Sequence, residues 1–228
     1  MTTRVTYRCD NGVATITMDD GKVNALSPAM FAELNAAFDR AAADGAAVVL
    51  SGRDGVFSGG FDLGVLKGGG LDALAMLRAG FELAERLLSF PAPVVVACPG
   101  HAIAMGFFLL LSGDYRIGAA GPFRLVANEV AIGLTMPHAA VEICRQRLAP
   151  AAFNRAIILA EPFSPEDGIS AGILDRTVDA ADLLATAQAV AAQLAQLNRP
   201  AHAASKLRAR GQTLTALRAA IEADFPQA

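Results

Sequence analysis

Cysteine and histidine are scarce in this chain, with three residues of each among 228. The cysteines Cys9, Cys98 and Cys144 are far apart and odd in number, a pattern that argues against a disulfide framework and is typical of a reduced, cytoplasmic protein. No histidine stands at metal-ligand spacing from a cysteine. The sequence therefore predicts no metal site.

A basic surface is also missing. The formal net charge is −3, the pI is near 5.6, and no stretch interleaves basic with aromatic residues. Such a chain has no general electrostatic attraction to nucleic acid or to an anionic membrane. We therefore expect neither of them as a partner.

Charged residues are absent from 87–113, in a chain whose mean hydropathy is +0.40. This stretch is long enough to cross a bilayer, which takes roughly 20 apolar residues. However, Pro91, Pro93 and Pro99 interrupt it, and Gly100 follows directly. A buried strand followed by a buried helix is the better interpretation.

The N-terminal part of the chain alternates strand and helix patterns. Alternating apolar residues on both sides of the turn at 10–12 predict a hairpin over 4–18, and a strand this early argues against a signal peptide. Ser27 and Pro28 begin a helix that ends near Gly45. Further strands are expected at 46–50, 94–97, 114–118 and 122–125, and a further helix at 71–90.

The C-terminal part reads as helices at 138–148, 150–160, 180–197 and 203–224. No low-complexity linker precedes them. We therefore expect one domain, an α/β core over residues 1–180 that carries a helical region over 181–228.

Two segments share a strand, a turn of small residues and a helix. They are GVFSGGFDLGVL at 55–66 and PGHAIAMGFFLLLSGD at 99–114. A helix N-terminus after small residues presents free backbone N–H groups, and two such ends can together bind an oxygen that gains negative charge. This arrangement is one interpretation of a common loop pattern.

Six motifs in a fixed order resemble those of the crotonase (enoyl-CoA hydratase/isomerase) superfamily over nearly the whole chain. They are GKVNAL (21–26), VFSGGFDL (56–63), GHAIAMG (100–106) with GDYRIGA (113–119), NEVAIGLTMP (128–137) and SPEDGISAGILDRTV (164–178). The resemblance implies a spiral of ββα turns whose C-terminal helices build trimers or hexamers. It also implies an acyl-coenzyme A thioester as the ligand, with no separate cofactor.

By position, the resemblance assigns the backbone N–H groups of Phe61 and Met105 to the thioester oxygen. Asp62 would cap the helix behind Phe61, and His138 would lie on a loop near the acyl group. The candidates for binding the coenzyme A ester are Lys22, Gly60, Asp62, Leu63, Phe108 and His138, with Lys22 directed at the phosphates.

The departures from the family pattern concern the acid–base residues. Hydratases of the family carry two glutamates, and here the first position is Phe108 whereas the second is Glu129. One carboxylate suffices to move a proton between two carbons of an activated thioester, and apolar neighbours raise its pKa toward neutrality. The resemblance therefore favours an enoyl-CoA isomerase with Glu129 as its base. Met105 is bulkier than the family's glycine, which leaves the shape of the oxyanion hole open.

Several alternatives stay open at this point. Glu129 could be structural, bonded to backbone N–H groups or paired with Arg116 or Arg124, and Asp114 is expected to pair with Arg116 or to cap a strand. The whole protein could be a hydratase that uses one glutamate, a non-catalytic acyl-CoA-binding protein, or a scaffold that acts through its trimer faces.

Overall fold

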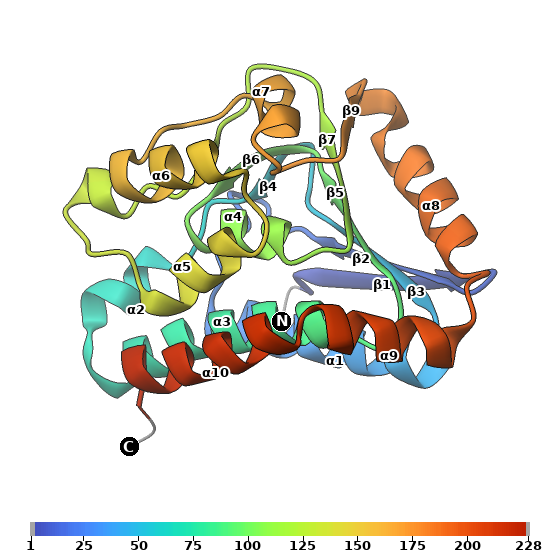
Figure 1. The fold of residues 1–228 in the computed structure, drawn as a ribbon, viewed down its shortest axis with the longest axis horizontal. Coiled ribbons are helices and arrows are strands. Elements are labelled where there is room, and N and C mark those ends of the chain that lie inside the picture. The colour runs from blue at the N-terminus through green and yellow to red at the C-terminus, as the bar shows by residue number, and fades with distance from the viewer. Residues whose placement is uncertain (1–2, 227–228) are drawn as a thin grey trace.

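A six-stranded sheet lies at the centre of the computed structural model, which describes residues 3–226 (Figure 1). Its strands are β1 (Val5–Asp10), β2 (Val13–Met18), β3 (Ala47–Ser51), β5 (Val94–Cys98), β7 (Tyr115–Ala119) and β9 (Arg176–Val178), adjacent in that order. The pair β1–β2 is the expected hairpin, and its turn residues Asn11 and Gly12 both have positive φ. The other neighbours are parallel.

A second, three-stranded sheet holds β4 (Gly55–Ser58), β6 (Gly100–Ile103) and β8 (Leu125–Val126), all parallel. Each strand of this small sheet follows a strand of the large sheet along the chain. The two segments with turns of small residues, 55–66 and 99–114, then lead into helices. Helices α2 (Leu63–Gly68) and α3 (Gly70–Ser89) follow β4, and α4 (Met105–Leu111) follows β6. This is the spiral of ββα turns that the family resemblance implies.

The remaining helices are α1 (Pro28–Asp44), α5 (His138–Arg145), α6 (Pro150–Leu159), α7 (Pro165–Ser170), α8 (Leu183–Leu194), α9 (Arg199–Ala209) and α10 (Gly211–Asp224), with 3₁₀ turns at Val130–Ile132 and Ala180–Asp182. Ser27 caps α1 as expected, through a hydrogen bond from the Met30 N–H. The single helix predicted over 203–224 is wrong. It is two helices that meet at Arg210, whose guanidinium donates to Asp114 and to the Leu88 carbonyl.

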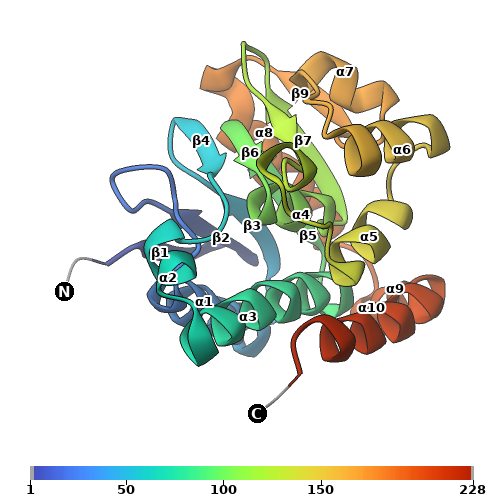
Figure 2. The same cartoon turned by 90° about the vertical axis from the view of Figure 1, so that its left-hand side faces the viewer.

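Alternate residues of the central strands pack into two separate cores, one on each face of the large sheet. Helix α8 covers one face, where Ala187 and Ala191 meet Val49 and Val95. The larger core, on the other face, includes residues of α1, α3, α4 and α10 and reaches the small sheet through Phe57. Figure 2 shows α3 and α10 side by side beneath α4 and α5.

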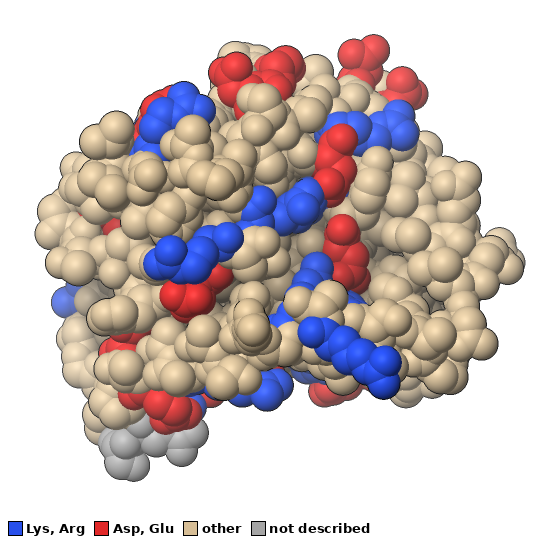
Figure 3. Space-filling model, in the orientation of Figure 1, with Lys and Arg blue, Asp and Glu red and all other residues tan. Residues whose placement is uncertain are grey.

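The uncharged stretch 87–113 folds as the end of α3, then β5, β6 and α4, so the expected strand and buried helix are confirmed. Within residues 3–226 no helix combines the length and the apolar character needed to cross a bilayer. On the face drawn in Figure 3, basic and acidic side chains lie interspersed and form no stripe of one sign.

Candidate active site

The small sheet gathers three segments that are far apart in the sequence. The segments after β4, β6 and β8 carry Phe61, Met105 and Glu129 respectively. Since parallel neighbouring strands end at the same edge of a sheet, the three segments emerge together. The Ala104 N–H donates to the Val126 carbonyl at 2.9 Å, which joins the second segment to the third.

The first turn depends on Gly60, which has φ +91°. A Cβ added there would lie 3.0 Å from the Ile103 carbonyl oxygen and 3.6 Å from the Met105 nitrogen. A glycine therefore lets the turn that carries Phe61 lie directly against the turn that carries Met105. Asp62 caps α2 as expected, since its Oδ1 accepts from the N–H groups of Gly64 and Val65 at 2.7 and 3.2 Å.

Met105 is the first residue of α4, and its side chain is fully buried. Its sulfur and the Phe61 ring both pack against Gly80 of α3, where an added Cβ would meet them at 3.2 and 2.6 Å. The bulk of Met105 is therefore directed into the core. Ala104, just before it, has φ +50° and ψ −122°, a conformation that an L-residue rarely adopts and that functional sites often contain.

The backbone N–H groups of Phe61 and Met105 donate to no acceptor within residues 3–226. Met105 has no intrahelical partner because it opens α4, where the helix dipole also favours negative charge. Two adjacent, unused N–H groups can bind an oxygen that becomes anionic during a reaction. These two N–H groups are therefore the candidate donors of an oxyanion hole.

Glu129 leads into the 3₁₀ turn after β8, and only 8 % of its surface is exposed. Burial raises the pKa of its carboxyl to about 7, against a smaller opposing effect of its own backbone N–H. Its Oε2 atom has no hydrogen-bond partner among residues 3–226. Glu129 is thus a buried carboxyl group poised to gain or lose a proton near neutral pH.

The ion pairs proposed for a structural Glu129 are not formed. Arg116 instead donates from Nη2 to Oδ2 of Asp175 at 2.5 Å, and Arg124 makes no ion pair within residues 3–226. Of the two roles expected for Asp114, the pair with Arg116 is wrong and the cap of a strand is confirmed. Asp114 forms ion pairs at 2.7 Å with Lys206 of α9 and with Arg210, the C-terminal cap of that helix. Its carboxylate also accepts a hydrogen bond from the N–H of Val94, the first residue of β5. These partners are remote in sequence, so no local pattern indicates them.

Phe108 lies fully buried on α4, and its ring stacks on Phe81 of α3 with centroids 6.0 Å apart. Phe81 also contacts the Phe61 ring at 6.3 Å, and Phe61 in turn contacts Phe31 at 6.2 Å. Phe108, to which the family resemblance assigns the position of a first glutamate, is therefore an aromatic ring within the core. It packs the core behind the two N–H donors and has no group that can transfer a proton.

Lys22 and Leu63 lie exposed at the outer side of the first turn. The segment of Lys22 is tied to that turn by hydrogen bonds from Gly59 to Val23 and from Leu26 to Gly60. His138 is not on a loop as expected. It is the first residue of α5, and its Nδ1 lies 2.8 Å from Oδ1 of Asp224.

Sequence analysis did not identify Ser58 and Asp20, whose side chains hold the first turn and the segment of Lys22 in place through hydrogen bonds to the backbone. The Ser58 hydroxyl accepts from the Gly60 N–H at 3.1 Å and donates to the Asn24 carbonyl at 2.8 Å. Burial acts to raise the pKa of Asp20, but hydrogen bonds from the backbone of Ala25, Asn24 and Lys22 outweigh it and lower that pKa. A serine directly before two glycines, and an aspartate before a Gly-Lys turn, were the available signals.

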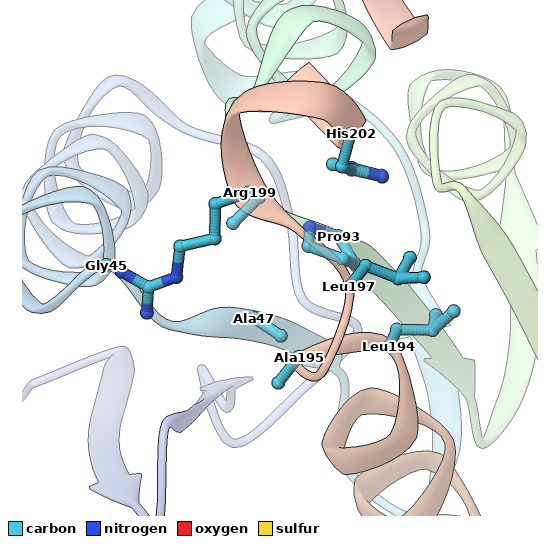
Figure 4. A pocket seen from close by; sticks show the side chains of 9 residues that line it. Gly45, Ala47, Pro93, Leu194, Ala195, Leu197, Arg199 and His202 are labelled. Carbon is cyan, nitrogen blue, oxygen red and sulfur yellow. The ribbon is translucent and has the colours of Figure 1, made fainter. Parts of the chain in front are cut away.

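Of two hollows, the larger adjoins the first turn and the smaller lies away from the three segments of the site. A groove of about 620 Å³ lies between α1, α2 and α3 and is lined by Pro28, Phe31, Ala32, Asn35, Val65, Gly68, Gly69, Asp72, Ala75, Met76 and Ala79. Its wall residue Phe31 packs on Phe61, so the groove lies behind the first N–H donor. Figure 4 shows a smaller hollow of about 10 Å³ where α8 leads into α9, and none of the segments that carry Phe61, Met105 and Glu129 lines it. Residues 3–226 hold no group of three or more potential metal ligands.

Comparison with known proteins finds relatives that all belong to one family. Residues 8–226 match the family described as enoyl-CoA hydratase/isomerase. A probable enoyl-CoA hydratase of Rhodobacter capsulatus is 32 % identical over 89 % of this chain and 79 % of its own length. An enoyl-CoA hydratase/isomerase family protein from Pseudomonas syringae is 51 % identical, with a TM-score of 0.95 over 97 % of this chain and 96 % of its own. A Mycobacterium tuberculosis protein is also 51 % identical with a TM-score of 0.94, and two structures of it are known. One structure, which aligns over 97 % of each chain, is described as an enoyl-CoA isomerase. The other, which aligns over 96 % of this chain and 94 % of its own, is described as a probable enoyl-CoA hydratase.

Proposed function

Since the chain belongs to the enoyl-CoA hydratase/isomerase family, we propose that it is an enoyl-CoA isomerase that uses Glu129 as its single acid–base residue. One observation carries the proposal. Glu129 is a buried carboxyl group without an ion pair in residues 3–226, and its pKa is raised to about 7. It follows β8, which pairs with β6, the strand that leads to the unused N–H group of Met105. A general base is most effective when its pKa lies near the working pH.

The reaction begins when the thioester oxygen of a 3-enoyl-CoA accepts hydrogen bonds from the N–H groups of Phe61 and Met105. These bonds stabilise negative charge on that oxygen, which acidifies the protons on C2. The Glu129 carboxylate takes one C2 proton, and the electron pair moves into a dienolate that spans the thioester and the C3–C4 bond. The protonated Glu129 then returns the proton to C4, which leaves the double bond between C2 and C3.

The surroundings of Glu129 suit both halves of this cycle. An apolar setting makes the carboxylate more basic than in water, and it tolerates the neutral acid that forms midway. Because the same carboxyl accepts and returns the proton, no second acid–base residue is needed. Hydration in contrast benefits from a second group that activates water, and Phe108 cannot supply one.

We assign the remaining candidates to the acyl-CoA thioester. Lys22 is directed at the phosphates, Gly60, Asp62 and Leu63 shape the site of the nucleotide and thioester, and Phe108 and His138 border the acyl group. The reaction as proposed uses no cofactor beyond the coenzyme A of its substrate. We further propose that residues 181–228 contribute to a homotrimer or hexamer, and the cytoplasmic location stays a prediction from the reduced cysteines.

Incubation with a trans-3-enoyl-CoA and, separately, with a trans-2-enoyl-CoA tests the proposal, with products identified by mass and chromatography. Conversion of the first ester to its 2-enoyl isomer without a change in mass is expected. Addition of one water to the second ester would instead identify a hydratase. Binding of both esters without turnover would identify a non-catalytic acyl-CoA-binding protein.

The variant Glu129→Gln separates the role of this carboxyl from that of the fold. It should abolish isomerisation while binding of the coenzyme A ester survives, because the amide cannot take a proton but has nearly the same shape. A variant with full activity would show that the base lies elsewhere.

A further inference from the structure

The last turn of α10 contacts two helices that back the candidate site (Figure 2). On one side, Arg78 of α3 donates to both carboxylate oxygens of Glu222 and, at 2.7 Å, to the carbonyl of Phe225. Arg78 therefore binds a side chain of this turn and also satisfies a carbonyl at the C-terminal end of α10. The Arg78 side chain is largely buried, which favours a persistent contact.

On the other side, Asp224 caps the N-terminus of α5. Its Oδ2 accepts from the Ala139 N–H at 2.9 Å, and its Oδ1 lies 2.8 Å from Nδ1 of His138. Helix α5 has no cap from its own preceding residue, because Pro137 precedes it. A carboxylate from another helix therefore supplies the N-cap interaction, and the Asp224 side chain is only 11 % exposed.

Helix α5 directly follows the segment that carries Glu129. That segment, 129–137, contains a single 3₁₀ turn and several exposed apolar residues. Its first end is fixed by β8, and its second end is fixed by the start of α5. Asp224 thus holds one of the two ends that determine where the Glu129 carboxyl lies.

Phe225 connects the same turn to the N–H donors. Its ring stacks on Phe81 of α3, with centroids 5.4 Å apart and planes at 12°. Phe81 contacts the ring of Phe61, whose backbone N–H is the first donor, and the ring of Phe108 on α4, the helix that the second donor opens. One turn of α10 therefore touches the supports of both the base and the donors.

We propose that Asp224 and Phe225 are positioning residues, which hold the Glu129 segment in register with the N–H groups of Phe61 and Met105. The proposal rests on the function proposed above. Neither side chain touches the reacting atoms. Each acts through a neighbour, Asp224 through the cap of α5 and Phe225 through the ring of Phe81.

The variant Asp224→Ala tests the proposal, with Arg218→Ala as its matched control. Arg218 also belongs to α10 and binds Glu85 of α3 at 2.7 Å, but it lies outside the last turn and its side chain is mostly exposed. Both variants therefore remove a polar side chain that joins α10 to a neighbouring helix. Only Asp224→Ala loses the cap of α5.

Two readouts are needed. The first is kcat with KM, expressed per binding-competent site as titrated with a saturated acyl-CoA, and the second is backbone amide exchange over 129–145. For Asp224→Ala we expect kcat to fall about tenfold while KM changes little, since small displacements of a catalytic group affect the chemical step most strongly. Asp224→Asn should restore most of the rate, because its amide oxygen can still accept the Ala139 N–H. Backbone amide exchange over 129–145 should become faster in Asp224→Ala and not in Arg218→Ala.

Equal kcat values for Asp224→Ala and Arg218→Ala would overturn the positioning role. If Asp224→Ala fails to fold, Phe225→Leu tests the same turn by the same two readouts, and an unchanged kcat together with unchanged amide exchange over 129–145 in Phe225→Leu would overturn the proposal. Amide exchange does not depend on turnover. Absence of any enoyl-CoA turnover in the parent protein would therefore refute the proposed function, while exchange over 129–145 would still show whether Asp224 holds that segment.

Discussion

The raised pKa of Glu129 predicts that the ionised carboxylate, which the proposed reaction needs, lowers the stability of the folded protein. The carboxyl titrates at about 7 in the folded protein, against 4.5 as its ordinary value. Between these two values the folded state binds the proton more tightly than the unfolded state does. Stability is therefore fully present below about pH 4.5 and is lost as the pH rises toward 7.

The size of this loss follows from the shift. Each pKa unit corresponds to about 1.4 kcal/mol, so ionised Glu129 costs about 3 kcal/mol of folding free energy above pH 7. Of this, about 2.5 kcal/mol should develop between pH 5 and pH 8. Glu129→Gln carries a neutral amide at every pH and lacks this dependence. Any constant effect of the amide itself, which also lacks a bonding partner, cancels when the two pH values are compared.

Urea unfolding of both proteins at pH 5 and pH 8 is the appropriate assay. We expect the stability of Glu129→Gln relative to the parent protein to increase by about 2.5 kcal/mol from the lower to the higher pH. All other titrating groups are common to both proteins and cancel in the difference. A difference that stays constant from pH 5 to pH 8 would refute the argument, because it would mean that Glu129 titrates alike in the folded and unfolded states.

Two further predictions concern the reaction itself. The value of kcat/KM for a 3-enoyl-CoA should rise with pH and level off with an apparent pKa of about 7, because the free enzyme needs Glu129 ionised; a flat profile between pH 5.5 and 8.5 would exclude it as the base. Gly60→Ala should lower kcat by at least about tenfold, since its Cβ would lie 3.0 Å from the Ile103 oxygen at φ +91° and push the two donor turns apart. Gly211→Ala, at a glycine with open space around it, is the control.

Much of the fold follows from local sequence signals. The Asn11-Gly12 turn, the Ser27 cap and Gly45, which ends α1 with φ +57°, each act within a few residues. Such signals operate through short-range hydrogen bonds and backbone sterics, so they can be read without knowledge of the rest of the chain. The error at 203–224 has the opposite origin. The helix divides at Arg210, whose side chain is bound to Asp114 and Leu88, and neither partner is near it in sequence.

The sequence by itself determined which chemical groups are available: one glutamate among apolar residues, a phenylalanine where the family resemblance places another glutamate, and two turns of small residues that open helices. It left open whether Arg116 neutralises Glu129 and whether Met105 obstructs the second donor. Only the tertiary structure decided these points, because Asp175 binds Arg116 and Gly80 receives the Met105 side chain. Both outcomes depend on contacts between residues that are distant along the chain, and the energy of such contacts is set by packing and burial that no local pattern contains.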